Sequence, residues 1–83
     1  MFKSIEIYEV DTTAGKTITG PGIINVVYER INSSLDYKPY INIDGLNDLL
    51  PNIGNNYLFK NSVKIYTTKA GYGCKAIVAL FND

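Results

Sequence analysis

The stretch from Asn61 to Asn82 constrains the fold more than any other part of the sequence. Val63–Thr68 is β-branched or aromatic at almost every position, a composition typical of a strand on a half-buried, pleated surface. Ala76–Phe81 is apolar on both alternating faces, which favours a central strand or one covered on both sides. Between them, Gly71 and Gly73 can supply the positive φ angles of a hairpin loop. The sequence therefore predicts a C-terminal β-hairpin.

Shorter strands are predicted elsewhere in the chain. Phe2–Val10 alternates, with Ile5 and Ile7 on one face. Tyr40–Ile43 has the composition of a brief strand. Tyr57–Lys60 is either another short strand or the beginning of the long one, in which case Asn61 and Ser62 would form a bulge. The residues between the first strand and Gly20 are rich in Thr, Gly and Lys, which is typical of a loop.

Two helices are predicted between these strands. The apolar residues of positions 23–35 recur at helical spacing, and Pro21 suits a first helical position. We therefore expect a long helix over Pro21–Leu35, held by packing on a sheet because its β-branched residues are poor helix formers. Asp44 is a good N-cap for a brief second helix over Gly45–Leu50. Its inward-facing residues would be Leu46, Leu49 and Leu50.

These elements predict an α+β fold in the order β-α-β-α-β-β. The sheet would have three to five strands, antiparallel or mixed, with the long helix packed on one face. Eighty-three residues form a single domain, 1–83. A chain this short buries only ~60–65% of its unfolded surface, so apolar surface is left over for self-association, and we expect a homodimer.

The charge pattern argues against a polyanionic partner. The eight basic and eight acidic residues give a formal net charge of zero, and both kinds are dispersed. A nucleic-acid-binding protein usually carries a basic stripe. A mimic of DNA would need a run of acids.

The sequence favours a cytoplasmic location, or the host cytoplasm for a virus-encoded protein. Cys74 is the single cysteine, so it cannot form an internal disulfide, which fits a reducing compartment. The first ten residues contain acids and lack the apolar segment of a signal peptide. No apolar run approaches the ~18 residues of a membrane span, and we expect no membrane contact.

The chain has few residues of the types that usually carry out catalysis. The chain has no histidine, which is the commonest general base. Cys74 lacks an evident activating base. Asp44 and Asp48 resemble a carboxylate pair, but helix capping explains the first and solvent exposure the second. We expect no cofactor and no metal, although a small acid–base enzyme using Asp, Glu, Lys and Tyr stays an alternative.

Two short motifs are incomplete. Ala14-Gly15-Lys16-Thr17 is similar to the end of a phosphate-binding P-loop, but Val10 stands where that pattern has its first glycine. Gly71-Tyr72-Gly73 resembles the centre of the RNA-recognition-motif signature. There Ala70 replaces the basic residue, and Cys74 and Ile77 replace aromatic ones. The simpler interpretation of the first motif is a mobile loop. The simpler interpretation of the second is a hairpin loop with an exposed tyrosine.

The seven tyrosines are the most suggestive feature, because a core this small cannot bury them all with every hydroxyl paired. Tyrosine offers a large contact area at little cost in rotamer entropy and is enriched in interfaces. An AT-rich genome would also raise tyrosine content, together with Ile, Asn and Lys. The candidate binding residues are Tyr37, Tyr40, Tyr66, Lys69 and Tyr72.

The leading hypothesis is a non-enzymatic protein-binding module. A small, histidine-free, AT-biased chain fits a virus or mobile-element product that binds and blocks a host defence protein, such as a CRISPR effector. The alternative is a nucleic-acid-binding module, in which tyrosines stack on bases and Lys64, Lys69 and Lys75 meet phosphates. If those three lysines share a face, we expect salt-dependent binding to RNA or single-stranded DNA.

Overall fold

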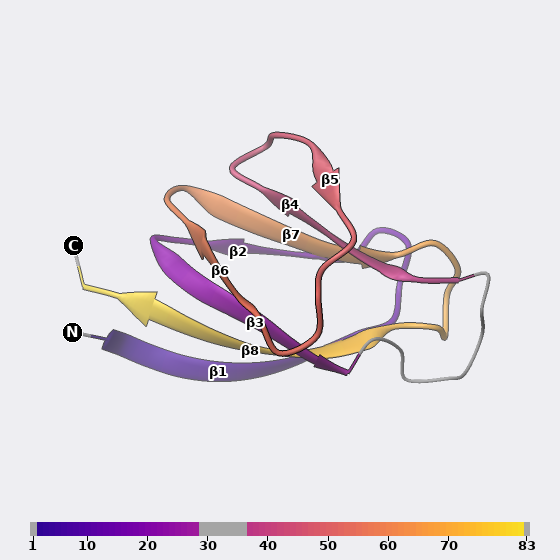
Figure 1. Cartoon of the computed structure of the whole chain (residues 1–83), viewed down its shortest axis with the longest axis horizontal. Coiled ribbons are helices and arrows are strands. Elements are labelled where there is room, and N and C mark those ends of the chain that lie inside the picture. The colour runs from indigo at the N-terminus through magenta and orange to yellow at the C-terminus, as the bar shows by residue number, and fades with distance from the viewer. Residues whose placement is uncertain (1, 29–36, 83) are drawn as a thin grey trace.

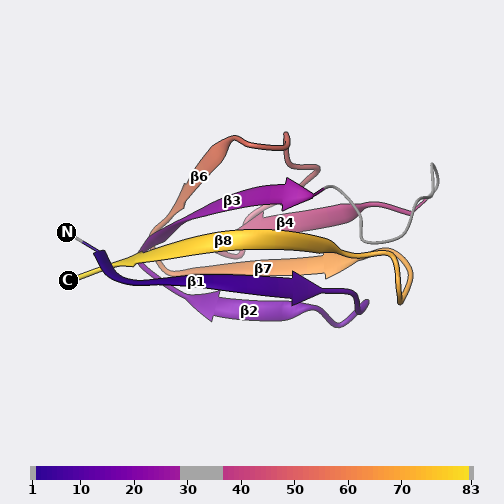
Figure 2. The same ribbon diagram turned by 90° about the horizontal axis from the view of Figure 1, so that it is seen from below.

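The computed structural model describes residues 2–28 and 37–82, and these residues form an all-β protein without a helix (Figure 1). Two four-stranded antiparallel sheets pack face to face (Figure 2). Sheet A has the strand order β1-β8-β3-β6, and sheet B has the order β2-β7-β4-β5. The strands are β1 (Phe2–Val10), β2 (Lys16–Thr19), β3 (Gly22–Tyr28), β4 (Pro39–Ile43), β5 (Asp48–Leu49), β6 (Asn56–Phe59), β7 (Ser62–Thr67) and β8 (Cys74–Phe81).

The chain passes from one sheet to the other at every connection except that between β4 and β5. Eight antiparallel strands wound in this way make a jelly roll. Most strand pairs therefore join segments far apart in the sequence: the first strand lies beside the last, and β3 pairs with both β8 and β6. This winding leaves each sheet with one face in the core and one outer face.

The core lies between the sheets and is made by alternate residues of each strand. On β3, Ile24 and Val26 are fully buried, and on β8 Ala76 and Val78 lie beside them. The Phe59 ring is the largest fully buried side chain. The remaining buried hydrophobic residues are Val10, Ile18, Ile41, Val63, Ile65 and Cys74.

The predicted α+β class and the long helix over Pro21–Leu35 are wrong. Gly22–Tyr28 is strand β3, and burial alternates along it with a period of two; positions 29–35 lie outside the described residues. Pro21 follows a cis peptide bond in the turn before β3 instead of opening a helix. The β-branched residues of this segment are poor helix formers and favour a strand, and the strand forms because two neighbouring strands pair with it.

The second predicted helix, Gly45–Leu50, is also wrong. Asp44 and Gly45 both have positive φ and turn the chain into the short strand β5. The three leucines of this β4–β5 hairpin are exposed rather than inward-facing. The Asp44 carboxylate does cap backbone N–H groups, but those of another turn: it accepts hydrogen bonds from Lys60, Asn61 and Ser62 at 2.7–3.2 Å.

The two C-terminal strands form, but they do not make a hairpin. β7 belongs to sheet B and β8 to sheet A, so the loop between them crosses the sandwich. Gly71 has the expected positive φ of 89°, whereas Gly73 does not. Gly73 is required for space, because a Cβ there would lie 1.7 Å from the Val10 carbonyl oxygen. Similarly, Asn61 is not in a bulge: its carbonyl accepts from Gly20 N–H where the chain changes sheets.

Several strand predictions are confirmed. The first strand runs from Phe2 to Val10 with Ile5 and Ile7 outward, and Tyr40–Ile43 lies within β4. β8 is central, between β1 and β3. Its outer face is not covered by another layer, since Ile77 is exposed there. The predicted loop after Val10 contains the short strand β2, which pairs with β7.

Candidate binding surface

The outer face of sheet B brings two of the candidate tyrosines together. Tyr40 on β4 and Tyr66 on β7 are directly opposite each other in the strand register. Their rings stack with centroids 5.7 Å apart and an interplanar angle of 19°. The Lys64 ammonium lies 5.3 Å from the centre of the Tyr66 ring, a cation–π arrangement.

A second aromatic pair lies at the end of the same sheet. The Tyr37 and Tyr72 rings are 5.0 Å apart, and the Lys69 ammonium lies 4.9 Å from the first and 5.9 Å from the second. Backbone contacts hold these loops in place: Thr68 N–H donates to the Lys38 carbonyl, and Lys38 N–H donates to the Thr68 hydroxyl. We call the surface made by Tyr37, Tyr40, Lys64, Tyr66, Lys69 and Tyr72 the tyrosine–lysine face.

Polar contacts fix the orientation of the central tyrosine. The Tyr66 hydroxyl donates to the Asp48 carboxylate, which also accepts from the Asn42 amide at 2.9 Å. The bond from Asn42 lowers the pKa of Asp48, with Tyr66 adding to the effect, so this carboxylate is ionised at neutral pH. Desolvation, followed by the bond to Asp48, raises the pKa of Tyr66. These contacts and the stacking on Tyr40 orient the Tyr66 ring.

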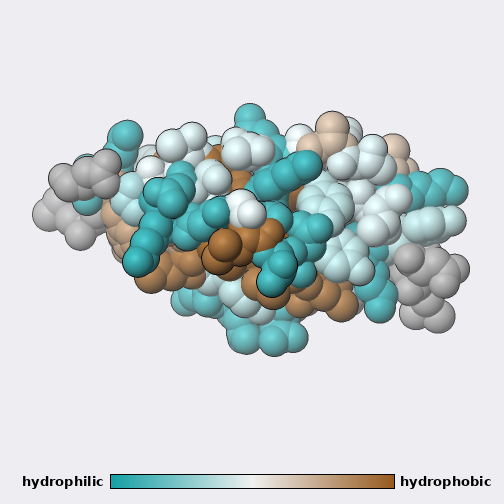
Figure 3. Space-filling view, turned by 90° about the horizontal axis from the view of Figure 1, so that it is seen from above, coloured by the Kyte–Doolittle hydropathy of each residue, from teal (hydrophilic) through white to brown (hydrophobic). Residues whose placement is uncertain are grey.

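Figure 3 looks onto sheet B and shows a mainly hydrophilic or neutral surface, with hydrophobic side chains gathered in the middle and along one side. The β4–β5 hairpin contributes exposed apolar side chains, of which Leu46 is the most exposed at 72%. Together with Ile43, Asn47 and Leu49 it lines a shallow hollow of about 290 Å³. In the strand register Leu49 lies opposite Ile41, so it belongs to the core-facing side of sheet B, away from Tyr40 and Tyr66.

The five candidate binding residues form two contact groups, Tyr40 with Tyr66 and Tyr37 with Tyr72 and Lys69. The three lysines of the nucleic-acid hypothesis do not share a face, because Lys75 lies on the outer side of sheet A, 3.3 Å from the Glu9 carboxylate. The sequence interpretation also missed a row of exposed aliphatic residues on sheet A. The alternation of Ile5 and Ile7 was its signal, and only the strand order shows how far the row extends.

The structure accounts for the three residues singled out for catalysis, Cys74, Asp44 and Asp48. Cys74 is fully buried, and desolvation raises the pKa of its thiol to about 11, so the thiolate is scarce at neutral pH. Asp44 is used in the turn contacts described above, and Asp48 in orienting Tyr66. Among the described residues, no group of three or more acids, cysteines or histidines is placed to hold a metal ion.

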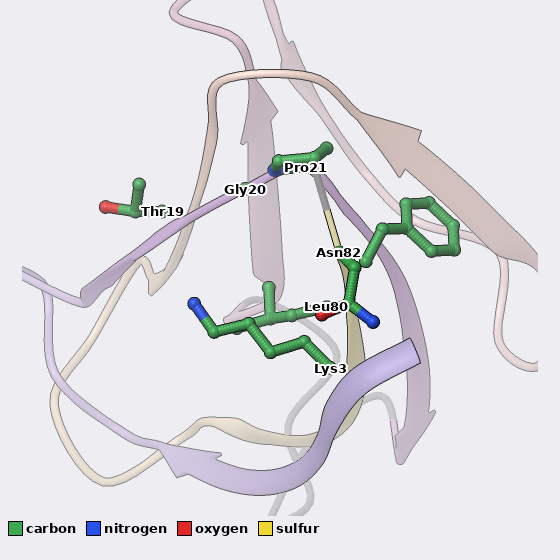
Figure 4. A pocket seen from close by; sticks show the side chains of 7 residues that line it. Lys3, Thr19, Gly20, Pro21, Leu80 and Asn82 are labelled. Atoms are coloured by element: carbon green, nitrogen blue, oxygen red, sulfur yellow. The ribbon is translucent and has the colours of Figure 1, made fainter. Parts of the chain in front are cut away.

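A hollow of about 280 Å³ lies between the β2–β3 turn and the end of β8 (Figure 4). Its lining includes the Lys3 side chain, which extends across it, and the side chain of Asn82. Neither this hollow nor the one at the β4–β5 hairpin is lined by an acid together with a tyrosine. These two hollows therefore offer no acid–base pair.

The P-loop-like segment has a structural explanation. Gly15, with φ of 70°, precedes strand β2 rather than a helix, and its N–H donates to the Thr12 hydroxyl at 2.9 Å. A Cβ at Gly15 would lie 2.0 Å from the Ile65 carbonyl oxygen, so glycine is needed where the loop passes β7. Without a following helix, the N-terminal N–H groups that bind phosphate in a P-loop are missing here.

No family model, curated protein or solved structure matches the chain. Within residues 2–28 and 37–82, no helix has the length and apolarity needed to cross a membrane.

Proposed function

We propose that the chain is a non-enzymatic protein-binding module that contacts its partner through the tyrosine–lysine face. The observation that carries this proposal is the stacked pair of Tyr40 and Tyr66, with Tyr66 held by Asp48. Two such rings present a large amphipathic area with few rotamers left to lose on binding. Steric occlusion of a host protein is the mode of action that fits a chain of this size.

The surrounding charges indicate the chemistry of the partner. The ammonium groups of Lys64 and Lys69 lie over the aromatic rings, while the Asp48 carboxylate already interacts with Tyr66 and Asn42. A partner surface with carboxylates around an apolar centre would be complementary to the lysines and to the tyrosine rings.

The proposal is tested by capture of a partner from the cells that naturally carry this sequence. The immobilised chain should retain a protein, and the double substitution Tyr40→Ala and Tyr66→Ala should weaken its binding by at least about tenfold, since central tyrosines act as hot spots. Tyr28→Ala is the matched control, because Tyr28 is 58% exposed but lies on sheet A. Equal loss in the control, or undiminished binding by the double variant, would refute the proposal.

A second candidate function is single-stranded nucleic-acid binding, favoured by the lysine ammonium groups that lie over tyrosine rings on this face. It predicts that affinity for a labelled oligonucleotide falls with salt. It also predicts that Lys64→Ala and Lys69→Ala each reduce the salt slope by about 1. Lack of binding at low salt would exclude it.

A further inference from the structure

The outer face of sheet A carries an aliphatic row that crosses all four strands. Ile5 on β1 lies opposite Ala79 on β8, which lies opposite Ile23 on β3, which in turn lies opposite Leu58 on β6. In the next row along the strands, Ile7 lies opposite Ile77. We call this surface the aliphatic face, and it consists of Ile5, Ile7, Ile23, Leu58, Ile77 and Ala79.

These side chains are exposed to a degree unusual for aliphatic residues in a sheet. Ile5 is 65% exposed, Ile7 67%, Leu58 60% and Ile77 37%. Scattered single apolar residues on a surface need no explanation, but a contiguous patch of them marks an interaction site. The aliphatic face is contiguous because neighbouring strands lie only about 4.8 Å apart.

At the two ends of the aliphatic face, charged and aromatic side chains contact each other within the chain. At one end, Glu9 and Lys75 form an ion pair, and the Lys75 ammonium also lies 5.5 Å from the centre of the Tyr28 ring. At the other end, the Phe2 and Phe81 rings stack with centroids 5.3 Å apart. The charged groups at the border thus satisfy each other, and neither described hollow is lined by residues of this face.

The size of the face suits a contact with a whole protein surface. Four strands cover about 19 Å and the eight residues of β8 about 26 Å, so the outer side of sheet A as a whole measures roughly 400–500 Å², and the aliphatic face is its central part. That is roughly a tenth of the 4996 Å² accessible surface, the share that a specific interface takes from a small protein. Two such faces together approach the ~1,000 Å² that a specific interface requires.

From this face we infer that the chain binds a second copy of itself, sheet A against sheet A. Two identical faces meet without electrostatic repulsion, because Glu9 and Lys75 neutralise each other and the chain has no net charge. Two aliphatic sheet faces can pack on each other at the ~10 Å spacing of stacked sheets. Such an isologous contact leaves the tyrosine–lysine face of each copy exposed on the far side.

Sedimentation velocity of the 83-residue chain tests the inference, which does not depend on the proposed function. The unaltered chain should sediment with at least twice its 9.2-kDa mass. The double substitution Ile5→Glu and Ile7→Glu should abolish this association, because two charges per copy would be buried without partners. Leu46→Glu with Leu49→Glu on the β4–β5 hairpin is the matched control and should leave the mass unchanged.

A milder variant separates loss of association from loss of folding. Ile5→Thr with Ile7→Thr keeps β-branched side chains on the strand and should raise the dissociation constant by at least about tenfold, with an unchanged circular dichroism spectrum. A monomeric unaltered chain would overturn the inference. So would association that survives both isoleucine variants, or that is lost only when the hairpin leucines are changed.

Discussion

At the scale of single residues, the fold depends on Phe59 and the two glycines against which its ring packs. A Cβ at Gly20 would lie 2.7 Å from Phe59 Cδ2, and a Cβ at Gly22 would lie 2.8 Å from Phe59 Cζ. The glycines thus leave the space that the largest core side chain fills. This contact joins the β2–β3 turn to the end of β6. At both places the chain passes from one sheet to the other.

Replacing Phe59 by alanine should therefore cost about 3–5 kcal/mol of unfolding free energy. A domain of this size has only roughly 4–12 kcal/mol in total, so the variant should be largely unfolded or close to it. Urea unfolding followed by circular dichroism measures the loss. Leu46→Ala is the control, because its side chain lies outside the core, and an equal loss in both variants would contradict this account.

At the scale of elements, Asp44 ties the β4–β5 hairpin to the β6–β7 turn. Its carboxylate accepts N–H groups from Asn61, Lys60 and Ser62, while its own N–H donates to the Ser62 carbonyl at 2.8 Å. Five backbone groups of two neighbouring turns are thereby satisfied at one residue. The bond from Asn61 N–H is the main reason that the pKa of Asp44 lies below its usual 3.8.

Asp44→Asn should lower the melting temperature at neutral pH by several degrees, because an amide accepts these hydrogen bonds less strongly than a carboxylate. Since the folded-state pKa is depressed, the carboxylate's contribution is complete above pH 3.8 and is lost as the pH falls through the lower, folded value. The difference between the two proteins should be largest near pH 7 and smaller near about pH 2. Thermal unfolding at both pH values checks this, and a difference that is independent of pH would contradict it.

The elements also show what sequence patterns can predict here. The strands at Phe2–Val10 and Tyr40–Ile43 have a local signal, since alternation and β-branched content are properties of neighbouring residues. Residues 23–28 satisfied helical spacing and strand alternation equally, and only pairing with distant β8 and β6 decides between them. Likewise, nothing local distinguishes a hairpin loop at Gly71 from a loop that crosses between sheets.

At the scale of the whole molecule, the winding of the chain gives the two outer faces different surfaces. Sheet B presents aromatic rings and lysines, whereas sheet A presents aliphatic side chains. Sequence composition indicated the tyrosines of the first surface. It could not indicate the second, because Ile5, Ile23 and Leu58 become neighbours only through strand order.

The most direct test of this division into two faces is an amide NMR spectrum of the labelled chain, recorded from micromolar to millimolar concentration. We expect concentration-dependent shifts at β1, β8 and β3, around Ile5, Ile77 and Ile23, with the signals of Tyr40 and Tyr66 unchanged. Shifts centred on sheet B or on the β4–β5 hairpin, or a spectrum that does not change with concentration, would contradict it.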